Sequence, residues 1–400
     1  MFRRVLILAF LFICAGAVLA QDFKLFDRDF QVHGFASQGL VYTSENNWLT
    51  TNSSAGSVSF TDFGANLSVL ITDKLRAGAQ LYDRNLGQLG KWHPELDWAY
   101  ASYQFKPWFA IRGGKVKTVL GLYTDTQDLD FLHTFALLPQ SMYPTDLRDS
   151  TIAHTGGDVY GDIRLKNHMG ILSYTAYAGH REDSKYGGYP YLLKQAPGLI
   201  DFTSYGGLQY GGDLRWATPL KGLLVGASRL MEDINGYGTT TAFTATPAPY
   251  HEWSKSDWTN QYFGQYVHDR LQIDSEYRRY WRDQEIYSGL AEVQTDVRGW
   301  YFAAAYRVAK RFQFGSYYSH YALNVPPFLF QPTLLKAHIY DKVVTGRIDL
   351  SRFMNLKVEG HFMAGYGAPG YYPDGFYPSV NPQGLKPATN ALIAKYGFNF

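Results

Sequence analysis

The feature that most constrains the fold is a regular alternation of short and long connections along the whole chain. Segments of about ten residues, in which apolar and polar side chains alternate, are joined by these connections. The short ones are polar turns at Thr72–Lys74, Lys106–Pro107, Lys166–Gly170, Thr218–Gly222, His268–Asp269, Ala309–Arg311 and Ser351–Asn355. The long ones, rich in Gly, Pro, Ser and Asn, are Ser44–Ser57, Asn85–His93, Thr118–Ser150, Glu182–Thr203, Ile234–Ser256, Gln284–Gln294, Asn324–Lys336 and Gly367–Ala388. Joined in this way, the segments number about sixteen, with their long connections all at one end.

The segments have two chemically different faces. In Arg270–Arg282, one parity carries Asp274, Glu276 and Arg278, whereas the other carries Ile273 and Tyr277, with Arg279 as an exception. A period of two is the period of a β-strand. Charged rows of this density must face water, because an Arg or Lys at the centre of a bilayer costs about 2–4 kcal/mol. Such rows line either the solvated outside of a soluble sheet or the lumen of a membrane barrel.

The N-terminus predicts export. A basic start (Met1–Arg4), an apolar run (Val5–Ala17) and the small residues of Val18–Ala20 form a signal peptide, cleaved before Gln21. We therefore predict two parts, a signal peptide over 1–20 and a single barrel domain over 21–400.

Removal of the signal peptide also constrains the chemistry. It takes away the only cysteine, so no intramolecular disulfide is expected. It also removes two of the 37 basic residues, so the mature chain has as many basic as acidic residues, 35 of each, and no net charge. The absence of a basic excess argues against a nucleic-acid partner. No mature segment is apolar over the 18 or more residues of a membrane helix.

The final ten residues, Ala391–Phe400, form an amphipathic strand. Leu392, Tyr396, Phe398 and Phe400 share one face, and Lys395 and Asn399 lie on the other. In a membrane barrel this strand must pair with the first one, Gln31–Thr43, because an open edge in hydrocarbon leaves backbone groups without hydrogen bonds. Lys395 and Asn399 would then face the lumen.

Several motifs suggest a family. They are Gly34–Gly39 in the first segment, Leu96–Tyr100 in the fourth, Arg112–Gly121 before the third long connection, and the aromatic terminal strand. Together they resemble the Gram-negative outer-membrane porins, closest to the phosphate-selective porin-like group. The chain departs from that group at Val119–Gly121, where the family usually has Pro-Phe-Gly, and it shows no run of lumen lysines that would support phosphate selectivity.

This resemblance implies an all-β fold, a transmembrane antiparallel barrel of about sixteen strands with long extracellular loops. It also implies location in the bacterial outer membrane after passage through the periplasm, contact with outer-membrane lipid and lipopolysaccharide, and a homotrimer. The terminal residues Tyr396, Phe398 and Phe400 would close the barrel and carry the signal that the barrel assembly machinery reads.

The third long connection, Thr118–Ser150, contains five Asp against the single Arg148 and an apolar run, Phe131–Leu138. A loop of this kind is better folded into the lumen than left in water, and a sixteen-stranded barrel has room for it. The resemblance implies that it narrows the pore. We predict an acidic side made by Asp125, Asp128 and Asp130, facing a basic wall made by Lys115, Lys117, Arg76, Arg112, Arg164, Arg270 and Arg278.

The predicted function is passive diffusion of small hydrophilic solutes and ions through a water-filled channel, sorted by a field between these charges. No cofactor or metal is predicted. A substrate-specific channel for a sugar or an anion is the first alternative, with a stacking track of Tyr82, Tyr160, Tyr174 and Tyr177. A barrel enzyme is disfavoured, since the sequence has neither G-x-S-x-G nor H-E-x-x-H. An adhesin would use the loops Ile234–Ser256 and Gly367–Ala388.

Overall fold

The computed structural model describes residues 21–25, 28–194, 200–329, 332–366 and 375–400. The predicted signal peptide, 1–20, lies outside the described residues, as does part of the last long connection.

Most of the described chain is β-strand. The strands are β1 (Gln21–Leu25), β2 (Arg28–Thr43), β3 (Ser57–Leu70), β4 (Leu75–Leu86), β5 (Glu95–Lys106), β6 (Phe109–Lys117), β7 (Ala153–Arg164), β8 (Ile171–Glu182), β9 (Asp201–Ala217), β10 (Leu223–Thr240), β11 (Ala248–His268), β12 (Leu271–Ile286), β13 (Ala291–Ala309), β14 (Phe312–Val325), β15 (Leu335–Asp349), β16 (Met354–Tyr366) and β17 (Ala388–Asn399). The helices are α2 (Gly188–Leu193) and the 3-10 turns η2 (Ser53–Ala55), η3 (Asp130–Leu132), η4 (Thr145–Ser150), η5 (Lys166–His168), η6 (Tyr287–Gly289) and η7 (Pro378–Val380). None of the described helices is long and apolar enough to cross a membrane.

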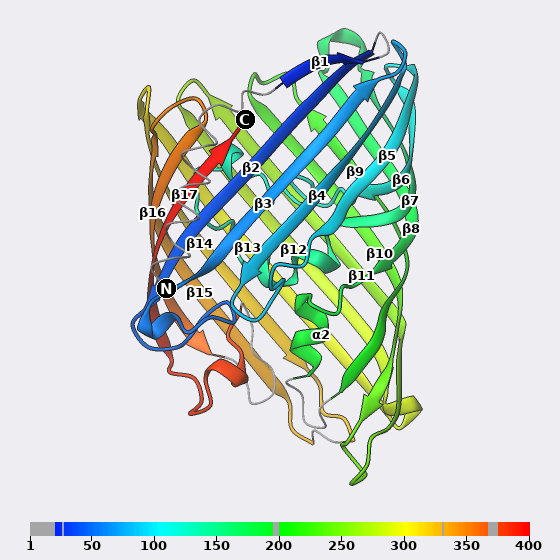
Figure 1. Ribbon diagram of the computed structural model, residues 1–400, viewed down its shortest axis with the longest axis vertical. Helices are drawn as coiled ribbons and strands as arrows, with labels where there is room; N and C mark the ends of the chain where they lie inside the picture. Colours follow the sequence, from blue (N-terminus) through cyan, green and yellow to red (C-terminus); the bar gives the residue numbers. More distant parts are fainter. Residues whose placement is uncertain (1–20, 26–27, 195–199, 330–331, 367–374) are drawn as a thin grey trace.

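The strands form one closed barrel (Figure 1). From β2 to β17, each strand pairs antiparallel with the next, and β17 pairs with β2. The closed barrel therefore has sixteen strands among the described residues, as predicted, and β1 adds a short partner to the start of β2. In Figure 1 the C-terminus lies at the end with the short turns, and the long loops extend from the opposite end.

Two predicted long connections are shorter in the structure. β10 continues to Thr240 and β11 begins at Ala248, so only residues 241–247 connect them rather than Ile234–Ser256. Likewise, residues 287–290 connect β12 to β13. The polar composition of these segments predicts loops. A strand that extends beyond the membrane can nevertheless keep its ladder of backbone hydrogen bonds, although its side chains are polar.

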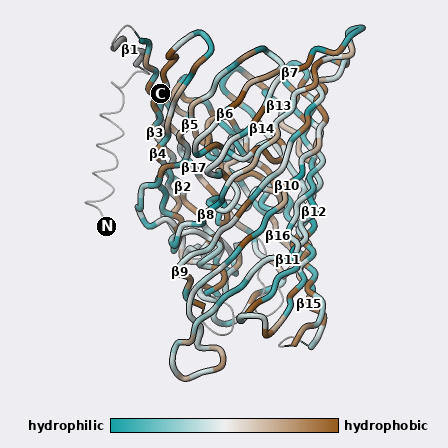
Figure 2. The backbone as a smooth tube through the Cα atoms, turned by 90° about the vertical axis from the view of Figure 1, so that its right-hand side faces the viewer, coloured by the Kyte–Doolittle hydropathy of each residue, from teal (hydrophilic) through white to brown (hydrophobic). Residues whose placement is uncertain are grey.

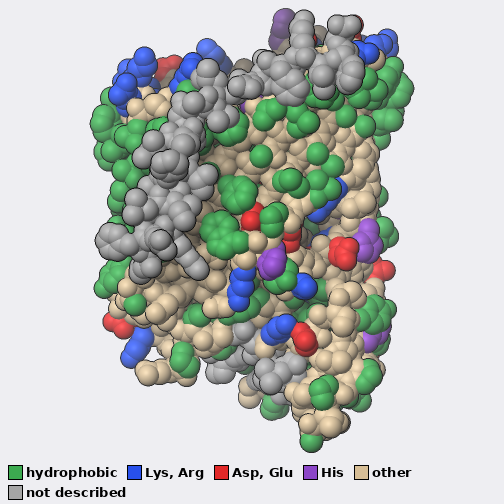
Figure 3. Space-filling view, in the orientation of Figure 1, with side chains coloured by type: hydrophobic (Ala, Val, Ile, Leu, Met, Phe, Trp, Pro, Cys, Tyr) green, Lys and Arg blue, Asp and Glu red, His purple; other side chains and the backbone are tan. Residues whose placement is uncertain are grey.

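The two faces predicted for Arg270–Arg282 are confirmed. Asp274 and Glu276 are 6% and 2% exposed inside the barrel, whereas Tyr277 is 39% exposed on the outside. Figure 2 shows hydrophilic and hydrophobic positions alternating along the strands, and Figure 3 shows apolar side chains gathered on the half of the outer wall nearer the short turns. A closed barrel with an apolar outer band and a charged interior is the architecture of bacterial outer-membrane proteins.

Barrel closure follows the predicted pairing. The register runs from Ala391 opposite Thr43 to Asn399 opposite Phe35, and it places Lys395 inside the barrel. Beyond the ladder, the amide of Phe400 donates to the carbonyl of Gly34 at 2.9 Å. Gly34 leaves room for the Phe400 ring, which would have to move if a Cβ were present, because that Cβ would lie 2.5 Å from it.

Candidate channel constriction

The third loop, residues 118–152, lies inside the barrel, as predicted. β6 is the shortest strand of the closed barrel and its pairing with β5 ends at Lys115, which leaves an opening through which the chain turns inward. The apolar part of the loop then packs on the far wall. Phe135, Leu138, Met142 and Tyr143 form a buried cluster with Tyr301, Ala303, Tyr317 and Val343 of β13 to β15.

Asp128 fixes the loop to the wall of β4 to β6. Its carboxylate lies 2.7 Å from the Lys117 ammonium and 3.4 Å from the Arg148 guanidinium, and the Gln80 amide donates to it at 3.0 Å. Arg148, itself in the loop, also pairs with Asp97 of β5 at 2.7 Å. Burial alone would raise the pKa of Asp128, but Lys117 and Arg148 hold it below its ordinary value.

Asp130 fixes the loop to β16 and β17, which lie across the closing β17–β2 pair from β4 to β6. Its carboxylate lies 3.0 Å from the Lys357 ammonium and 3.1 Å from that of Lys395. Burial opposes ionisation of this group, yet the two lysines lower the pKa of Asp130 to about 2. Nearby, the Arg347 guanidinium donates to the carbonyls of Phe131 and His133 at 2.8 and 2.7 Å.

The remaining wall also binds the loop. Glu276 of β12 accepts from the Leu122 amide at 3.0 Å, and Arg278 donates to the carbonyls of Met142 and Ser141 at 2.8 and 3.0 Å. On β16, Glu359 accepts from the amides of Ala136 and Leu137 at 2.8 and 3.0 Å. The loop is therefore held by charged hydrogen bonds on several sides of the lumen.

Two cavities border the loop. One, of about 270 Å³, lies between Tyr123, His133 and Phe135 of the loop and the wall residues Gln265, Asp274 and Tyr301. The other, of about 540 Å³, lies between Arg148 and Asp149 of the loop, strands β5 to β9, and the connection that contains α2.

Six of the seven predicted basic residues divide into three groups. Lys117 and Arg278 contact the loop directly. Arg112 lies in the lumen but pairs with Asp158 of β7, with Nε at 3.0 Å from the carboxylate. Arg76, Arg164 and Arg270 are exposed at the short-turn end of the barrel, in or next to the turns, rather than beside the loop.

Lys115 lies at the edge of the constriction. Its ammonium donates to the carbonyl of Leu96 at 2.6 Å, and it lines the cavity of about 540 Å³ together with Arg148 and Asp149 of the loop. The pairing of β6 continues through Gly113 and Gly114 without a bulge. For the proposed stacking track, the prediction of Tyr174 is wrong: it is paired with Gly161 on the outer face, and its hydroxyl donates to the Trp108 carbonyl at 2.8 Å.

The sequence predicts that Lys395 faces the lumen but does not assign it to the constriction, and it does not identify Lys357, Glu359 or Arg347 there. Arg84 was missed as well; it donates to Asp149 of the loop at 2.7 Å. The available signal was the alternation of inward and outward side chains along a strand. It tells whether a residue faces the lumen, but not which residue lies opposite it across the lumen.

Comparison with solved structures supports the fold. OmpT, an outer membrane protein of Vibrio cholerae, superimposes with a TM-score of 0.57 at 11% identity, over 95% of this chain and 100% of that chain. The anion-selective porin from Comamonas acidovorans gives a TM-score of 0.57 at 10% identity, over 93% and 100%. The chain has the fold of a Gram-negative outer-membrane porin.

The outer membrane channel DcaP of Acinetobacter baumannii has the same porin fold, with a TM-score of 0.54 at 12% identity over 95% of this chain and 100% of that one. No protein-family model matches the chain, and no curated protein matches it either. The porin fold is thus shared although most side chains differ.

Proposed function

We propose that the chain is an outer-membrane channel for the passive diffusion of small hydrophilic solutes and ions. The observation that carries this proposal is the position of the third loop. The loop crosses the lumen, is held there by ion pairs of Asp128 and Asp130, and has a cavity on either side. A sixteen-stranded barrel is wide enough for an aqueous channel, and an inserted loop narrows it to a size limit. The proposal includes no catalytic step and no cofactor.

Ion preference would come from charges beside the loop. Because Asp128 is neutralised by Lys117 and Arg148, and Asp130 by Lys357 and Lys395, passing ions would respond mainly to partly exposed groups such as Asp125 and Arg215. The Arg215 guanidinium donates to the Gly121 carbonyl of the loop at 2.8 Å, and the charges of Arg215 and Asp125 attract each other, so these two groups border the same part of the lumen. Opposed charges across a constriction set up a transverse field that sorts solutes by charge and dipole.

Conductance in planar lipid bilayers tests the channel. The purified protein should produce discrete current steps, and the triple variant Asp125→Asn, Asp128→Asn, Asp130→Asn should move the reversal potential in a salt gradient toward anions. Absence of current steps from folded, inserted protein would exclude a diffusion channel. An unchanged reversal potential in the triple variant would leave the channel but exclude this assignment of its charges.

We also propose a homotrimer that associates through the outer wall of β4 to β7. This wall is unusually smooth, because its outward positions include Ala77 and Ala79 on β4, Ala99 and Ala101 on β5, and Gly157 on β7. Among the solved structures of this fold, one is described as the trimer form of OmpT, with a TM-score of 0.54. Substituting Ala79 and Ala101 by Arg should yield monomers in sedimentation experiments, whereas intact trimers would exclude this face as the interface.

A further inference from the structure

The outer wall of β10 to β13 carries a group of charged residues that the channel does not use. We call Arg229, Arg279, Arg298, Asp296 and Trp258 the outer arginine cluster. Arg229 lies opposite Asn260, Asn260 opposite Arg279, and Arg279 opposite Arg298, so the three arginines lie in one row across four strands. Arg279 is the residue that broke the apolar face of its segment in the sequence.

The cluster has an excess of positive charge. The Asp296 carboxylate lies 2.9 Å from the guanidinium of Arg279 and 2.9 Å from that of Arg298. The Trp258 ring contacts two of the arginines: its centroid lies 5.5 Å from the Arg279 guanidinium and 5.9 Å from that of Arg229. One carboxylate against three guanidiniums leaves two positive charges, and the side chains of Arg279 and Arg298 are 38% and 50% exposed.

The depth of the cluster indicates what surrounds it. Arg279 follows Leu271, the first residue of β12, by about eight positions, which at a strand tilt of about 40° places it roughly 20 Å from the short-turn end. The apolar band of an outer-membrane barrel is about 25 Å tall. The cluster therefore lies where the apolar band meets the lipid head groups at the long-loop end of the barrel. In barrels of this kind the long loops are extracellular.

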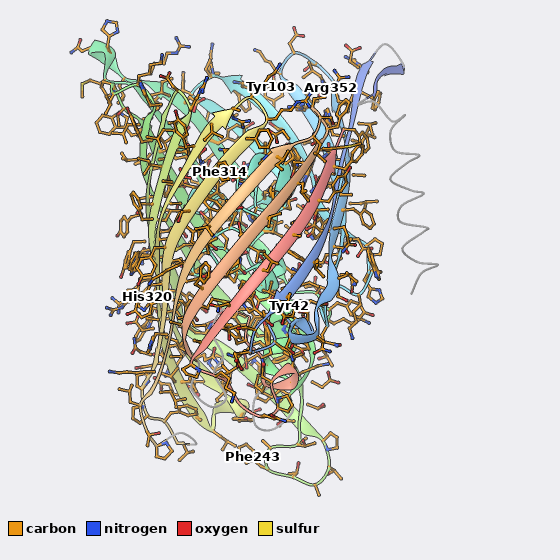
Figure 4. All side chains as sticks on the ribbon, turned by 90° about the vertical axis from the view of Figure 1, so that its left-hand side faces the viewer. Tyr42, Tyr103, Phe243, Phe314, His320 and Arg352 are labelled. Carbon is orange, nitrogen blue, oxygen red and sulfur yellow. The ribbon has the colours of Figure 1, made fainter. Side chains whose placement is uncertain are left out.

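An aromatic row supports this placement. The next outward row toward the short turns pairs Tyr262 with Tyr277, Tyr277 with Trp300, and Trp300 with His320. Figure 4 shows His320 among the side chains that project from the outer wall. Aromatic girdles mark the boundary between hydrocarbon and head groups. The arginines are thus at the level of lipid head groups, not in hydrocarbon or in loop water.

We propose that the outer arginine cluster binds the phosphate of an anionic lipid in the outer leaflet, namely the phosphorylated glucosamine of lipopolysaccharide. Arginine is suited to this ligand, because its planar guanidinium donates two parallel hydrogen bonds to a phosphate. The two excess charges match the charge of a phosphate group, and the acyl chains would lie along the apolar wall below the aromatic row. The site depends on the position of the barrel in the membrane and not on conduction through its lumen.

Native mass spectrometry of the detergent-solubilised protein with lipid A tests this site. The variant Arg229→Gln, Arg298→Gln removes both excess charges and leaves the Arg279–Asp296 pair intact, so folding is preserved. Its apparent Kd for bisphosphorylated lipid A should be at least tenfold weaker than that of the wild type, whereas Asp296→Asn, which adds a charge, should bind more tightly. The matched control is Arg311→Gln, Arg352→Gln, which removes two exposed arginines at the short-turn end and should bind as the wild type does.

Two further measurements separate the possible ligands. Lipid A from which the phosphates have been removed should bind to the wild type at least tenfold more weakly, and 10 mM inorganic phosphate should not displace intact lipid A. Equal affinity of the double variant and the wild type would overturn the proposal, as would equal binding of dephosphorylated lipid A. Displacement by free phosphate would also overturn it, since the site would then hold phosphate without the lipid. A channel that conducts normally in the double variant is expected, so the two proposals can fail separately.

Discussion

Replacing Asp130 by Asn should loosen the third loop without changing its shape. The carboxylate neutralises Lys357, which is completely buried, and shares Lys395 with the more distant Asp62, whose carboxylate is 3.5 Å from that lysine. An Asn keeps the size of the side chain but removes the charge. The variant would therefore leave at least one ammonium in the lumen without a counter-charge while the loop is docked.

The magnitude follows from the burial of the pair. Removing one partner of a buried ion pair typically costs about 3–5 kcal/mol. Lys357 keeps hydrogen bonds to the carbonyls of Asp130 and Phe135, at 2.6 and 3.0 Å, so the lower end of this range applies. A cost of about 3 kcal/mol shifts the equilibrium between docked and undocked loop by roughly 150-fold toward the undocked state.

Single-channel recording detects this shift. We expect Asp130→Asn to add transitions to a state of higher conductance and to move the ion preference toward anions. Adding Lys357→Met should restore steady currents, because it replaces the unpaired charge by an apolar side chain of similar length. Glu292→Gln is the matched control, since Glu292 pairs with Lys255 at 2.8 Å on the exposed outer wall and its loss should leave the currents unchanged. Steady, wild-type currents in Asp130→Asn would refute the idea that this ion pair holds the loop.

Three further predictions concern the loop and barrel closure. Burial lowers the pKa of His133 to about 4, and the neighbouring Lys357 also disfavours its charged form, whereas Asp130 and Asp128 favour it. Since the unperturbed value is about 6.5, docking should weaken as the pH falls from 6.5 to 4, by an amount on the order of 3 kcal/mol. Current fluctuations should therefore increase at pH 4.5 in the wild type but not in His133→Gln. Gly299→Val should displace the loop from β13, because a Cβ at Gly299 would meet the Ser141 carbonyl, whereas Gly264→Val, with nothing nearer than 3.9 Å, should conduct normally. Deleting Phe400 should reduce the amount of barrel in the outer-membrane fraction and leave the conductance of inserted molecules unchanged; normal insertion would show that the terminal residue is not the assembly signal.

The local pattern of the sequence was sufficient for the barrel itself. A period of two assigns each strand residue to the inner or outer face, and short turns force neighbouring segments to pair antiparallel. For this reason the strand order, the pairing of β17 with β2 and the inward position of Lys395 were all predictable. Each of these properties depends on adjacent segments or on the requirement that no edge remains open in hydrocarbon.

The tertiary structure alone decided the constriction. Asp130 meets Lys357 and Lys395, which lie more than 200 positions later in the chain, because the loop crosses the lumen and can reach any strand of the wall. The same structure joins the Lys115 ammonium to the Leu96 carbonyl and leaves Arg76, Arg164 and Arg270 at the short-turn end of the barrel. Strand parity contains no information on which charge lies opposite which, since that depends on the path of the loop and on the tilt of the closed wall. The residues that face the lumen could therefore be predicted from the sequence, whereas the ion pairs that hold the loop across the lumen depend on the tertiary structure.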